Sequence, residues 1–254
     1  MKIVILAAGQ GTRLLPLTND KPKCMVKFNN KPIIDYILES AKECKLDDIA
    51  VICGYKDKAL KKNLKDKKIT FYKNERFDQT NMVSTFFCAK EFLDDDIIIS
   101  YSDIIYNTDI LKKLINDEAH IGIIVDKSWK KLWSLRMDNP LDDAETLKVK
   151  DGKILELGKK PIGYDEIEGQ YIGLIKIKKN TVNKVIRYYE SLDKSILYNG
   201  NNYDNMYMTT FIQMIIDNLL DVKPIYINGG WVEIDSLVDL KKMEQIVDKL
   251  NLKI

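Results

Sequence analysis

The side chains best suited to chemistry follow a short apolar run near the amino terminus. Residues 3–8 are succeeded at once by Gly9-Gln10-Gly11-Thr12-Arg13, and Lys23 stands ten positions after Arg13. Two glycines allow the backbone to approach a ligand closely and to aim several N–H groups at it. The guanidinium group of Arg13 offers a planar fork that matches phosphate oxygens, and Lys23 adds a second positive charge. This spacing predicts a phosphate-binding loop.

Two better-known phosphate loops do not fit this segment. A P-loop ends in Gly-Lys followed by Ser or Thr, and that ending is absent here. A dinucleotide fingerprint requires a third glycine, and Leu14 occupies its place. A plain tight turn would explain two glycines alone, but not their combination with Thr12, Arg13 and Lys23. The loop therefore predicts neither a kinase nor a dehydrogenase.

Two aspartates are candidates for binding a cation near this loop. Asp103 follows the apolar run 97–101 and is expected at the same sheet edge as the loop, where open α/β sheets bind their ligands. Asp235 follows the segment that contains Trp231. Carboxylate oxygens suit Mg²⁺, which usually takes one or two of them together with substrate phosphates. The residues alone leave a simpler interpretation open, in which Asp103 is a turn residue and Asp235 only precedes a helix cap at Ser236.

The composition excludes several other classes of protein. The 254 residues contain 40 Lys and Arg against 38 Asp and Glu, a formal net charge of +2. A charge so close to zero gives no electrostatic reason to expect nucleic-acid or membrane partners. With one histidine, His120, neither a Ser-His-Asp triad nor a Cys/His zinc site is expected. The apolar run 3–8 is too short for a signal peptide or a membrane span, so we expect a cytoplasmic protein with free thiols.

Apolar periodicity predicts the elements that position these residues. In the first half, apolar runs alternate with helical patterns, which predicts an α/β fold with a doubly wound, mostly parallel sheet. The expected strands are residues 3–7, 49–53, 69–72, 97–101 and 121–125. The expected helices are one that opens at Pro32 and those at 59–64, 83–92 and 108–115.

The pattern changes in the second half. Short strands at 147–149, 154–157 and 171–177 predict a small antiparallel or mixed β extension. Helices are expected at 182–189 and 206–220, followed by a strand at 225–227. Ser236, with Asp239 three positions later, predicts the start of a last helix. Its apolar stripe is Leu237, Leu240, Met243, Ile246, Val247 and Leu250.

These motifs resemble the signature of the nucleotidyltransferases that make NDP-sugars and CDP-alcohols. That family has a Gly-x-Gly-Thr/Ser-Arg loop with a downstream Pro-Lys, here Gly9–Arg13 and Pro22-Lys23. The resemblance also includes Ser102-Asp103 and Glu233-Ile234-Asp235, so that it covers nearly the whole chain. Within the family, Asn81-Met82-Val83-Ser84 makes the chain most similar to the small phosphocholine-type cytidylyltransferases. A phosphoglutamine cytidylyltransferase, of the kind that serves capsular phosphoramidate synthesis, fits as well.

The resemblance implies a Rossmann-like enzyme and a reaction. A small phosphate monoester attacks the α-phosphorus of CTP, pyrophosphate leaves, and a CDP-linked product forms. In the family, the aspartates at the positions of Asp103 and Asp235 hold Mg²⁺ against the nucleotide phosphates. A monoester is mostly dianionic at pH 7, because its second pKa is about 6, and therefore needs no general base. Arg13 and Lys23 are the expected catalytic residues, because they can neutralise and align two anions.

A single domain is expected, with a nucleotide-binding half at 1–126 and an acceptor-binding half at 127–254. Asn and Gln side chains can satisfy the amino and carbonyl edge of cytosine. An ordinary helix-cap role for Thr80 or Asn81 fits the sequence equally well. The expected nucleotide contacts are Leu6, Ala7, Ala8, Gly9, Gly11, Thr12, Gln79, Asn81 and Ser84.

The acceptor has fewer markers in the sequence. Lys160 aligns with the Glu-Lys-Pro turn in which sugar nucleotidyltransferases place a lysine on the acceptor phosphate, although Lys159 replaces the usual acid. A choline-like cation would favour an aromatic and acidic pocket. An amino-acid phosphate would instead fit a carboxylate that faces its ammonium group, and the sequence leaves both acceptors open. The expected acceptor contacts are Lys160, Glu168, Tyr171, Trp231 and Glu233.

Two other functions stay open at this stage. One is a hexose-1-phosphate thymidylyl- or uridylyltransferase of the same family. The other is a regulatory nucleotide-binding domain that has lost turnover, against which the presence of Arg13, Lys23, Asp103 and Asp235 argues. A homodimer is common in the resembled family.

Overall fold

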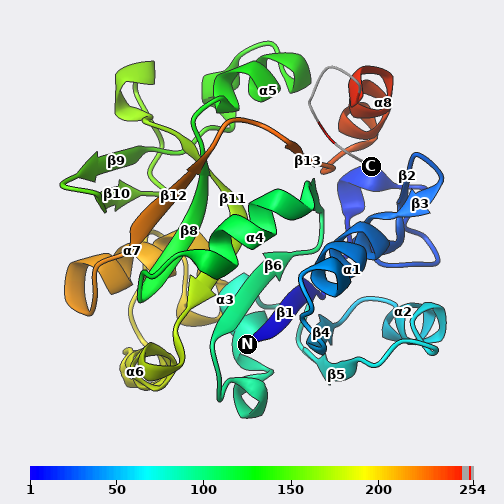
Figure 1. Cartoon of the computed structure of the whole chain (residues 1–254), viewed down its shortest axis with the longest axis horizontal. Helices are drawn as coiled ribbons and strands as arrows, with labels where there is room; N and C mark the ends of the chain where they lie inside the picture. Colours follow the sequence, from blue (N-terminus) through cyan, green and yellow to red (C-terminus); the bar gives the residue numbers. More distant parts are fainter. Residues whose placement is uncertain (248–251, 253–254) are drawn as a thin grey trace.

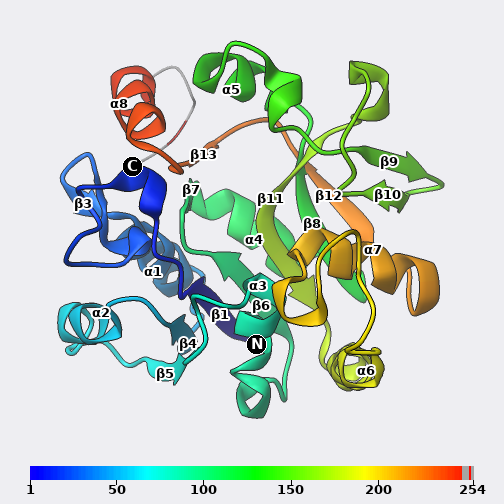
Figure 2. The same cartoon turned by 180° about the vertical axis from the view of Figure 1, so that it is seen from behind.

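A seven-stranded sheet forms the centre of the computed structural model, which describes residues 1–247 and 252 (Figures 1 and 2). Its strand order is β12-β8-β11-β6-β1-β4-β5. Neighbouring strands are parallel except at β11, which is antiparallel to both β6 and β8. The prediction of an α/β fold with a mostly parallel, Rossmann-like sheet is confirmed. The strands are β1 (Lys2–Ala7), β4 (Asp48–Cys53), β5 (Thr70–Lys73), β6 (Ile97–Tyr101), β8 (Ile121–Asp126), β11 (Gln170–Ile177) and β12 (Lys223–Ile227).

Helices cover both faces of this sheet, which is why its strands are apolar on both sides. Along β1, Ile3 and Ile5 point into one core, whereas Val4 and Leu6 point into the other, as the two-residue period of a strand requires. The first core includes residues from α1 (Ile33–Glu43), α2 (Asp57–Asn63), α4 (Thr108–Asn116), α5 (Trp129–Arg136) and α8 (Leu237–Ile246). The second includes residues from α3 (Met82–Phe87), α6 (Lys179–Ser191) and α7 (Met208–Asn218).

Three two-stranded ladders lie outside the central sheet. They are β2 (Lys27–Phe28) with β3 (Lys31–Pro32), β9 (Leu147–Lys150) with β10 (Lys153–Leu157), and β7 (Ile104–Tyr106) with β13 (Trp231–Glu233). The predicted β extension is the hairpin of β9 and β10. Its third expected strand, 171–177, was placed wrongly, because β11 lies inside the central sheet. Seven of its eight residues are buried, as a strand flanked on both edges and covered on both faces requires.

The helices follow the predicted pattern with two differences. The helix expected at 83–92 is interrupted: α3 ends at Phe87, and a short 3-10 turn follows at Lys90–Phe92. Helix α5 was not predicted. At the last helix, the Ser236 hydroxyl accepts a hydrogen bond from the Asp239 N–H at 3.1 Å, which confirms the predicted cap. Leu250, the last residue of the expected stripe, lies outside the described residues.

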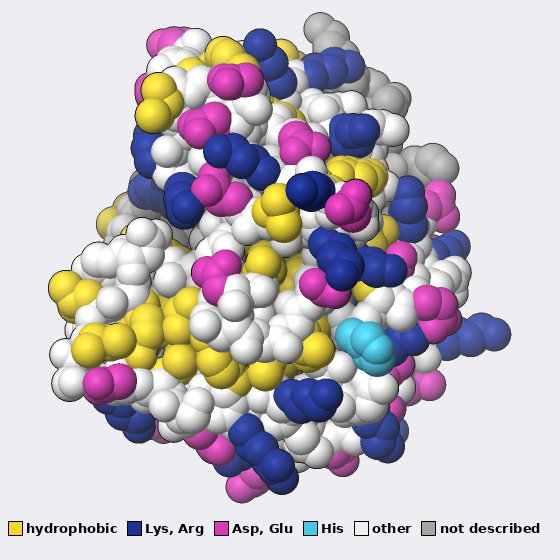
Figure 3. Space-filling view, turned by 90° about the vertical axis from the view of Figure 1, so that its left-hand side faces the viewer, with side chains coloured by type: hydrophobic (Ala, Val, Ile, Leu, Met, Phe, Trp, Pro, Cys, Tyr) yellow, Lys and Arg dark blue, Asp and Glu magenta, His cyan; other side chains and the backbone are white. Residues whose placement is uncertain are grey.

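The surface shows no dominant charge on the face that carries β9, β10 and α7. Figure 3 views this face and shows positive and negative side chains interspersed, with a band of hydrophobic side chains crossing its lower half. Within residues 1–247 and 252, no helix has the length and apolar character needed to cross a membrane.

Candidate active site

A cavity of about 360 Å³ opens where β1 and β6 end. We call it the first cavity. Ligands of open α/β sheets bind at this edge, because the loops after parallel strands converge there. Five stretches of chain contribute to its wall. The lining residues are Leu6, Ala8, Gly9, Gly11, Thr12, Arg13, Lys23, Phe77, Thr80, Asn81, Met82, Thr85, Tyr101, Ser102, Asp103, Glu233 and Asp235.

The glycines of the predicted loop have different structural roles. Gly11 has φ +67°, and a Cβ placed there would lie 2.8 Å from the Cβ of Lys23. Its carbonyl oxygen accepts a hydrogen bond from the Thr18 hydroxyl at 3.0 Å. The fold itself therefore requires glycine at position 11. A Cβ on Gly9 would meet no atom within 4 Å, so the space beside Gly9 is open to the cavity.

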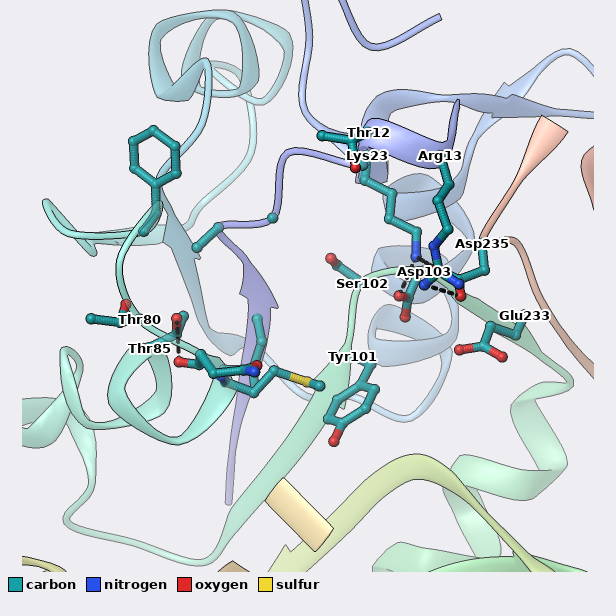
Figure 4. Close-up of a pocket in the computed structure, with 17 residues that line it drawn as sticks. Thr12, Arg13, Lys23, Thr80, Thr85, Tyr101, Ser102, Asp103, Glu233 and Asp235 are labelled. Atoms are coloured by element: carbon teal, nitrogen blue, oxygen red, sulfur yellow. Dashed lines mark hydrogen bonds and ion pairs between the residues drawn. The ribbon is translucent and has the colours of Figure 1, made fainter. Parts of the chain in front are cut away.

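Charged side chains gather at one end of the first cavity (Figure 4). The ammonium group of Lys23 donates a hydrogen bond to Asp103 Oδ2 at 2.7 Å and a second one to Asp235 Oδ1. Arg13 forms an ion pair with the other oxygen of Asp235. Glu233 lies beside them, and Asp103, Glu233 and Asp235 each offer an oxygen within 4.8 Å of the other two.

A short antiparallel ladder brings the two aspartates together. In the pairing of β7 with β13, Ile104 lies opposite Glu233. The Ile234 N–H then donates a hydrogen bond to the carbonyl oxygen of Asp103 at 2.9 Å. Asp103 stands just before β7 and Asp235 just after β13, so that residues 132 positions apart in the sequence share one end of a ladder.

The electrostatics of this end follow from the close packing of opposite charges. Burial acts to lower the pKa of Lys23, but the charges of Asp103, Asp235 and Glu233 outweigh burial and raise it above 10.5. Burial acts to raise the pKa of Asp235, and Lys23 and then Arg13 lower it below 3.8. Burial raises the pKa of Glu233 to about 7, against the opposing charge of Arg136. The cluster therefore keeps its lysine charged and Asp235 ionised.

Arg136 forms ion pairs with Glu233 of the cluster and with Asp239, and it was not among the predicted site residues. Its side chain is 2% exposed, and its guanidinium group pairs with Glu233 at 2.7 Å and with Asp239 at 3.1 Å. Burial opposes the positive charge of Arg136, but the charge of Glu233 and the hydrogen bond to Asp239 raise its pKa above the ordinary value. Helix α5 is thereby joined to β13 and to the start of α8.

The carboxylates could hold a hard divalent cation. Asp103 Oδ1 is buried and has no hydrogen-bond partner among the described residues. A buried carboxylate oxygen without a partner is costly unless a ligand satisfies it. Together with the nearby oxygens of Asp235 and Glu233, it provides the oxygen donors that such cations prefer.

Polar side chains line the opposite end of the first cavity. Figure 4 shows Thr80 and Thr85 far from the carboxylates. The buried Asn74 side chain holds both of them, because its amide donates to the Thr80 hydroxyl at 2.8 Å and to the Thr85 hydroxyl at 2.9 Å. Asn81 caps α3, since its side-chain oxygen accepts from the Met82 N–H at 2.8 Å. The cap interpretation is thus correct for Asn81, which also lines the cavity.

A second cavity, of about 150 Å³, adjoins the first. The two share Met82, Tyr101 and Glu233 as wall residues. The remaining residues of the second cavity are Trp133, Asp143, Glu145, Gln170, Tyr171, Ile172, Gly173, Tyr207, Met208, Thr209 and Trp231. Of the predicted acceptor contacts, the structure places Tyr171, Trp231 and Glu233 here.

Five predicted contacts lie outside the walls of both cavities. Ala7 is buried within β1, where it pairs with Cys53 of β4. The backbone carbonyl of Gln79 accepts a hydrogen bond from the Asn205 side chain at 3.1 Å, and the Ser84 hydroxyl donates to the Asp204 carbonyl at 2.9 Å. The last two of these residues, Lys160 and Glu168, form hydrogen bonds with backbone groups outside the cavities. The ammonium group of Lys160 donates to the carbonyls of residues 141 and 142, and the carboxylate of Glu168 accepts from the N–H of residue 149.

Comparisons with known proteins agree with this arrangement. The nucleotidyl transferase family matches residues 2–132. A CTP:phosphoglutamine cytidylyltransferase from Campylobacter jejuni is 51% identical over 95% of this chain and 98% of that protein. A choline-phosphate cytidylyltransferase from Streptococcus pneumoniae is 26% identical over 99% of this chain and 100% of that protein. The structure of an inositol-1-phosphate CTP transferase from T. maritima matches with a TM-score of 0.77 at 22% identity, covering 100% of this chain and 98% of that one.

The family match and the relative from Campylobacter jejuni together settle the family. The match spans just over half of the chain, from β1 into α5, and includes the loop, Lys23 and Asp103. The relative extends the similarity to the second half, where Glu233 and Asp235 lie. The resemblance predicted from the sequence is confirmed, and the chain belongs to the nucleotidyl transferase family of enzymes.

Proposed function

We propose that this chain transfers the cytidylyl group of CTP to phosphoglutamine and releases pyrophosphate. The observation that carries this proposal is the identity of 51% with the CTP:phosphoglutamine cytidylyltransferase over nearly the full length of both chains. The arrangement of two adjoining cavities agrees with it, because the reaction needs one site for a nucleotide and one for an acceptor.

The charged end of the first cavity suits the triphosphate of CTP. Arg13 and Lys23 lie there together with the backbone of the glycine loop, and they can offset the negative charge of the phosphates. The opposite end, with Thr80, Asn81 and Thr85, then receives the cytosine base. Asn and Thr side chains both donate and accept hydrogen bonds, as the amino and carbonyl edge of cytosine requires.

The reaction itself needs alignment and charge neutralisation. An oxygen of the acceptor phosphoryl group attacks the α-phosphorus of CTP, and the bond from that phosphorus to the β-phosphate oxygen breaks. The leaving group is pyrophosphate, and no proton must be removed from an already ionised nucleophile. Two anions repel each other, so the cationic groups of Arg13 and Lys23 lower the barrier by neutralising both. Holding the reacting atoms in line supplies a further part of the rate enhancement.

The carboxylate end fits Mg²⁺ as the cofactor. Asp103 and Asp235 would hold it, with Glu233 beside them, since Asp103 Oδ1 has no other partner among the described residues. When bound, the ion neutralises charge on the nucleotide phosphates.

A screen of nucleotides against acceptors tests the proposal. Pyrophosphate release is measured with CTP, UTP, dTTP or ATP and with phosphoglutamine, phosphocholine or glucose 1-phosphate, in the presence of Mg²⁺. We expect the highest kcat/KM for CTP with phosphoglutamine, and a product whose mass equals that of CDP-linked glutamine. A preference for UTP or dTTP with the hexose phosphate would overturn the proposal in favour of a sugar nucleotidyltransferase. Release with no pair would favour a binding domain without turnover.

A further inference from the structure

The second cavity has an unusual combination of side chains. Three carboxylates line it, those of Asp143, Glu145 and Glu233, and its wall contains no Lys, Arg or His among the described residues. Five aromatic side chains complete the wall: Tyr101, Trp133, Tyr171, Tyr207 and Trp231. An acidic cavity with aromatic walls attracts a cation.

Glu145 is held firmly in this wall. The Gln170 side chain, which is 4% exposed, donates to the Glu145 carbonyl at 2.6 Å and accepts from the Glu145 N–H at 3.0 Å. The Thr209 hydroxyl donates to Glu145 Oε1 at 3.3 Å. This two-point clamp on the backbone and the contact to the side chain fix where the carboxylate lies.

In the described part of the chain, no Lys or Arg nitrogen lies within 4.0 Å of the Glu145 or Asp143 carboxylate, although the charge of Arg136 acts on Asp143 from farther away. Burial raises the pKa of Glu145, and the nearby charge of Asp143 adds to the effect. An ionised carboxylate in such a place is unfavourable unless a ligand brings the missing positive charge.

Trp133 provides a separate indication of a ligand. Its side chain lines the second cavity and is 4% exposed, yet its indole N–H has no hydrogen-bond partner among the described residues. The ring is fixed between Trp129 and Trp231, with centroid distances of 5.9 Å to each. A buried indole N–H usually finds an acceptor. An oxygen of a bound molecule would supply it.

We propose that the second cavity binds the amino-acid end of the acceptor, with Glu145 and Asp143 receiving its ammonium group and Trp133 donating to one of its oxygens. This inference rests on the proposed function and adds the residues that select the acceptor. The phosphoryl group, at the other end of the same molecule, then reaches the first cavity past the shared residues Tyr101 and Glu233. The acidic and aromatic wall would also attract a quaternary ammonium. Phosphocholine nevertheless fits less well, because its quaternary ammonium has no N–H for Glu145 and its head group has no oxygen for Trp133.

Steady-state kinetics at saturating CTP tests the assignment. The variant Glu145→Gln keeps the size of the side chain but removes its charge. Because hydrogen bonds to charged groups are the stronger ones, KM for phosphoglutamine should rise by roughly 10–100-fold, whereas KM for CTP should stay within about twofold. Glu43→Gln is the matched control: Glu43 is exposed at the end of α1, lies outside both cavities, and its substitution should leave both constants unchanged.

Two further measurements test the same assignment in case Glu145→Gln does not fold. Trp133→Phe keeps the aromatic ring, removes the N–H and should raise KM for phosphoglutamine several-fold. For the wild-type enzyme, the deamino analogue of phosphoglutamine, with hydrogen in place of the ammonium group, should have a kcat/KM at least about 10-fold lower. If the wild type uses both acceptors equally well, or if Glu145→Gln leaves the acceptor KM unchanged, the inference is wrong while the proposed function stands. If the wild type does not use phosphoglutamine at all, the proposed function itself fails.

Discussion

The two adjoining cavities use charge in opposite ways. In the first, Lys23 and Arg13 are already paired with carboxylates, so positive and negative groups lie in contact before any ligand binds. In the second, the carboxylates of Asp143 and Glu145 form no direct ion pair in the described part of the chain, and the charge of Arg136 reaches Asp143 only from beyond 4.0 Å. The first cavity is therefore suited to exchanging partners with a charged phosphate chain, and the second to receiving a cation that the protein does not provide.

Glu233 belongs to both cavities and links them. Its carboxylate lies beside Asp103 and Asp235 on one side and lines the aromatic cavity on the other. Arg136 holds it from behind. Because Glu233 forms part of both walls, a single substitution that displaces its carboxylate should affect ligand binding in both cavities.

The largest effect is expected from Arg136→Met. Removing one partner of a buried ion pair leaves Glu233 and Asp239 without their counter-charge, which typically costs about 3–5 kcal/mol of unfolding free energy. Chemical denaturation should show this loss, and any folded fraction should bind both CTP and the acceptor less tightly, because the shared wall is displaced. Arg187→Met, at an exposed position on α6, should change the unfolding free energy by less than about 0.5 kcal/mol. Equal stabilities of the two variants would show that Arg136 does not hold the wall in place.

Lys23→Met should affect the first cavity alone. The substitution removes the ammonium group that offsets Asp103 and Asp235 and that is available to the phosphates. By analogy with the loss of one preorganised charge-stabilising donor, kcat should fall by roughly 10²–10³-fold. Lys21→Met, two positions away and outside the wall of either cavity, should keep kcat within about twofold. A Lys23→Met enzyme with normal kcat would remove the catalytic role from this residue.

The first cavity could be predicted from the sequence largely because its loop is contiguous. Gly9, Gly11 and Arg13 are within five positions of one another, so their spacing alone indicates a backbone that approaches phosphate groups. The strand before the loop could also be predicted, since its apolar residues are buried on both faces. The order of the strands in the sheet, and the position of β11 between β6 and β8, could not be inferred from periodicity.

The second cavity was predicted only in part: Tyr171, Trp231 and Glu233 were expected to contact the acceptor, but its other acidic residues were not, because their local sequence pattern is misleading. Asp143 and Glu145 lie in a short acidic stretch between elements, which has the composition of an exposed turn. In α5, the buried positions 129, 132, 133 and 136 have the regular spacing of a helical stripe, but the last of them is an arginine. The ion pairs that stabilise this buried charge come from Glu233 and Asp239, about a hundred positions away in the sequence. Strands β7 and β13, with three residues each, are too short for a period to be recognised.

The two loop glycines offer a smaller and more selective test. Gly11→Ala should lower the unfolding free energy by roughly 1–2 kcal/mol, because a side chain disfavours positive φ and its Cβ would collide with Lys23. Gly9→Ala should leave stability unchanged, since its Cβ would meet only open space, but it should raise KM for CTP about 10-fold by filling room that the nucleotide needs. Thermal melts and nucleotide kinetics on both variants separate the two roles. A normal CTP affinity in Gly9→Ala would mean that the nucleotide does not pass beside this glycine.

The smallest expected effect is the loss of folding stability that the ionised carboxylate of Glu145 causes. Because burial and then Asp143 raise the pKa of Glu145 above 4.5, against the hydrogen bond from Thr209, the folded chain binds this proton more tightly than the unfolded chain does. The wild type therefore loses folding stability as the pH rises from 4.5 through the raised pKa of Glu145. The Glu145→Gln variant has no titrating group at this position and should not show this loss. The Tm of the variant should equal that of the wild type near about pH 4 and exceed it near about pH 7.5. If Glu145→Gln has a higher Tm but binds the acceptor less tightly, Glu145 serves ligand binding and lowers the stability of the wild-type fold. A Tm difference that is the same at both pH values would instead make Glu145 a structural residue and would remove the contrast between the two cavities.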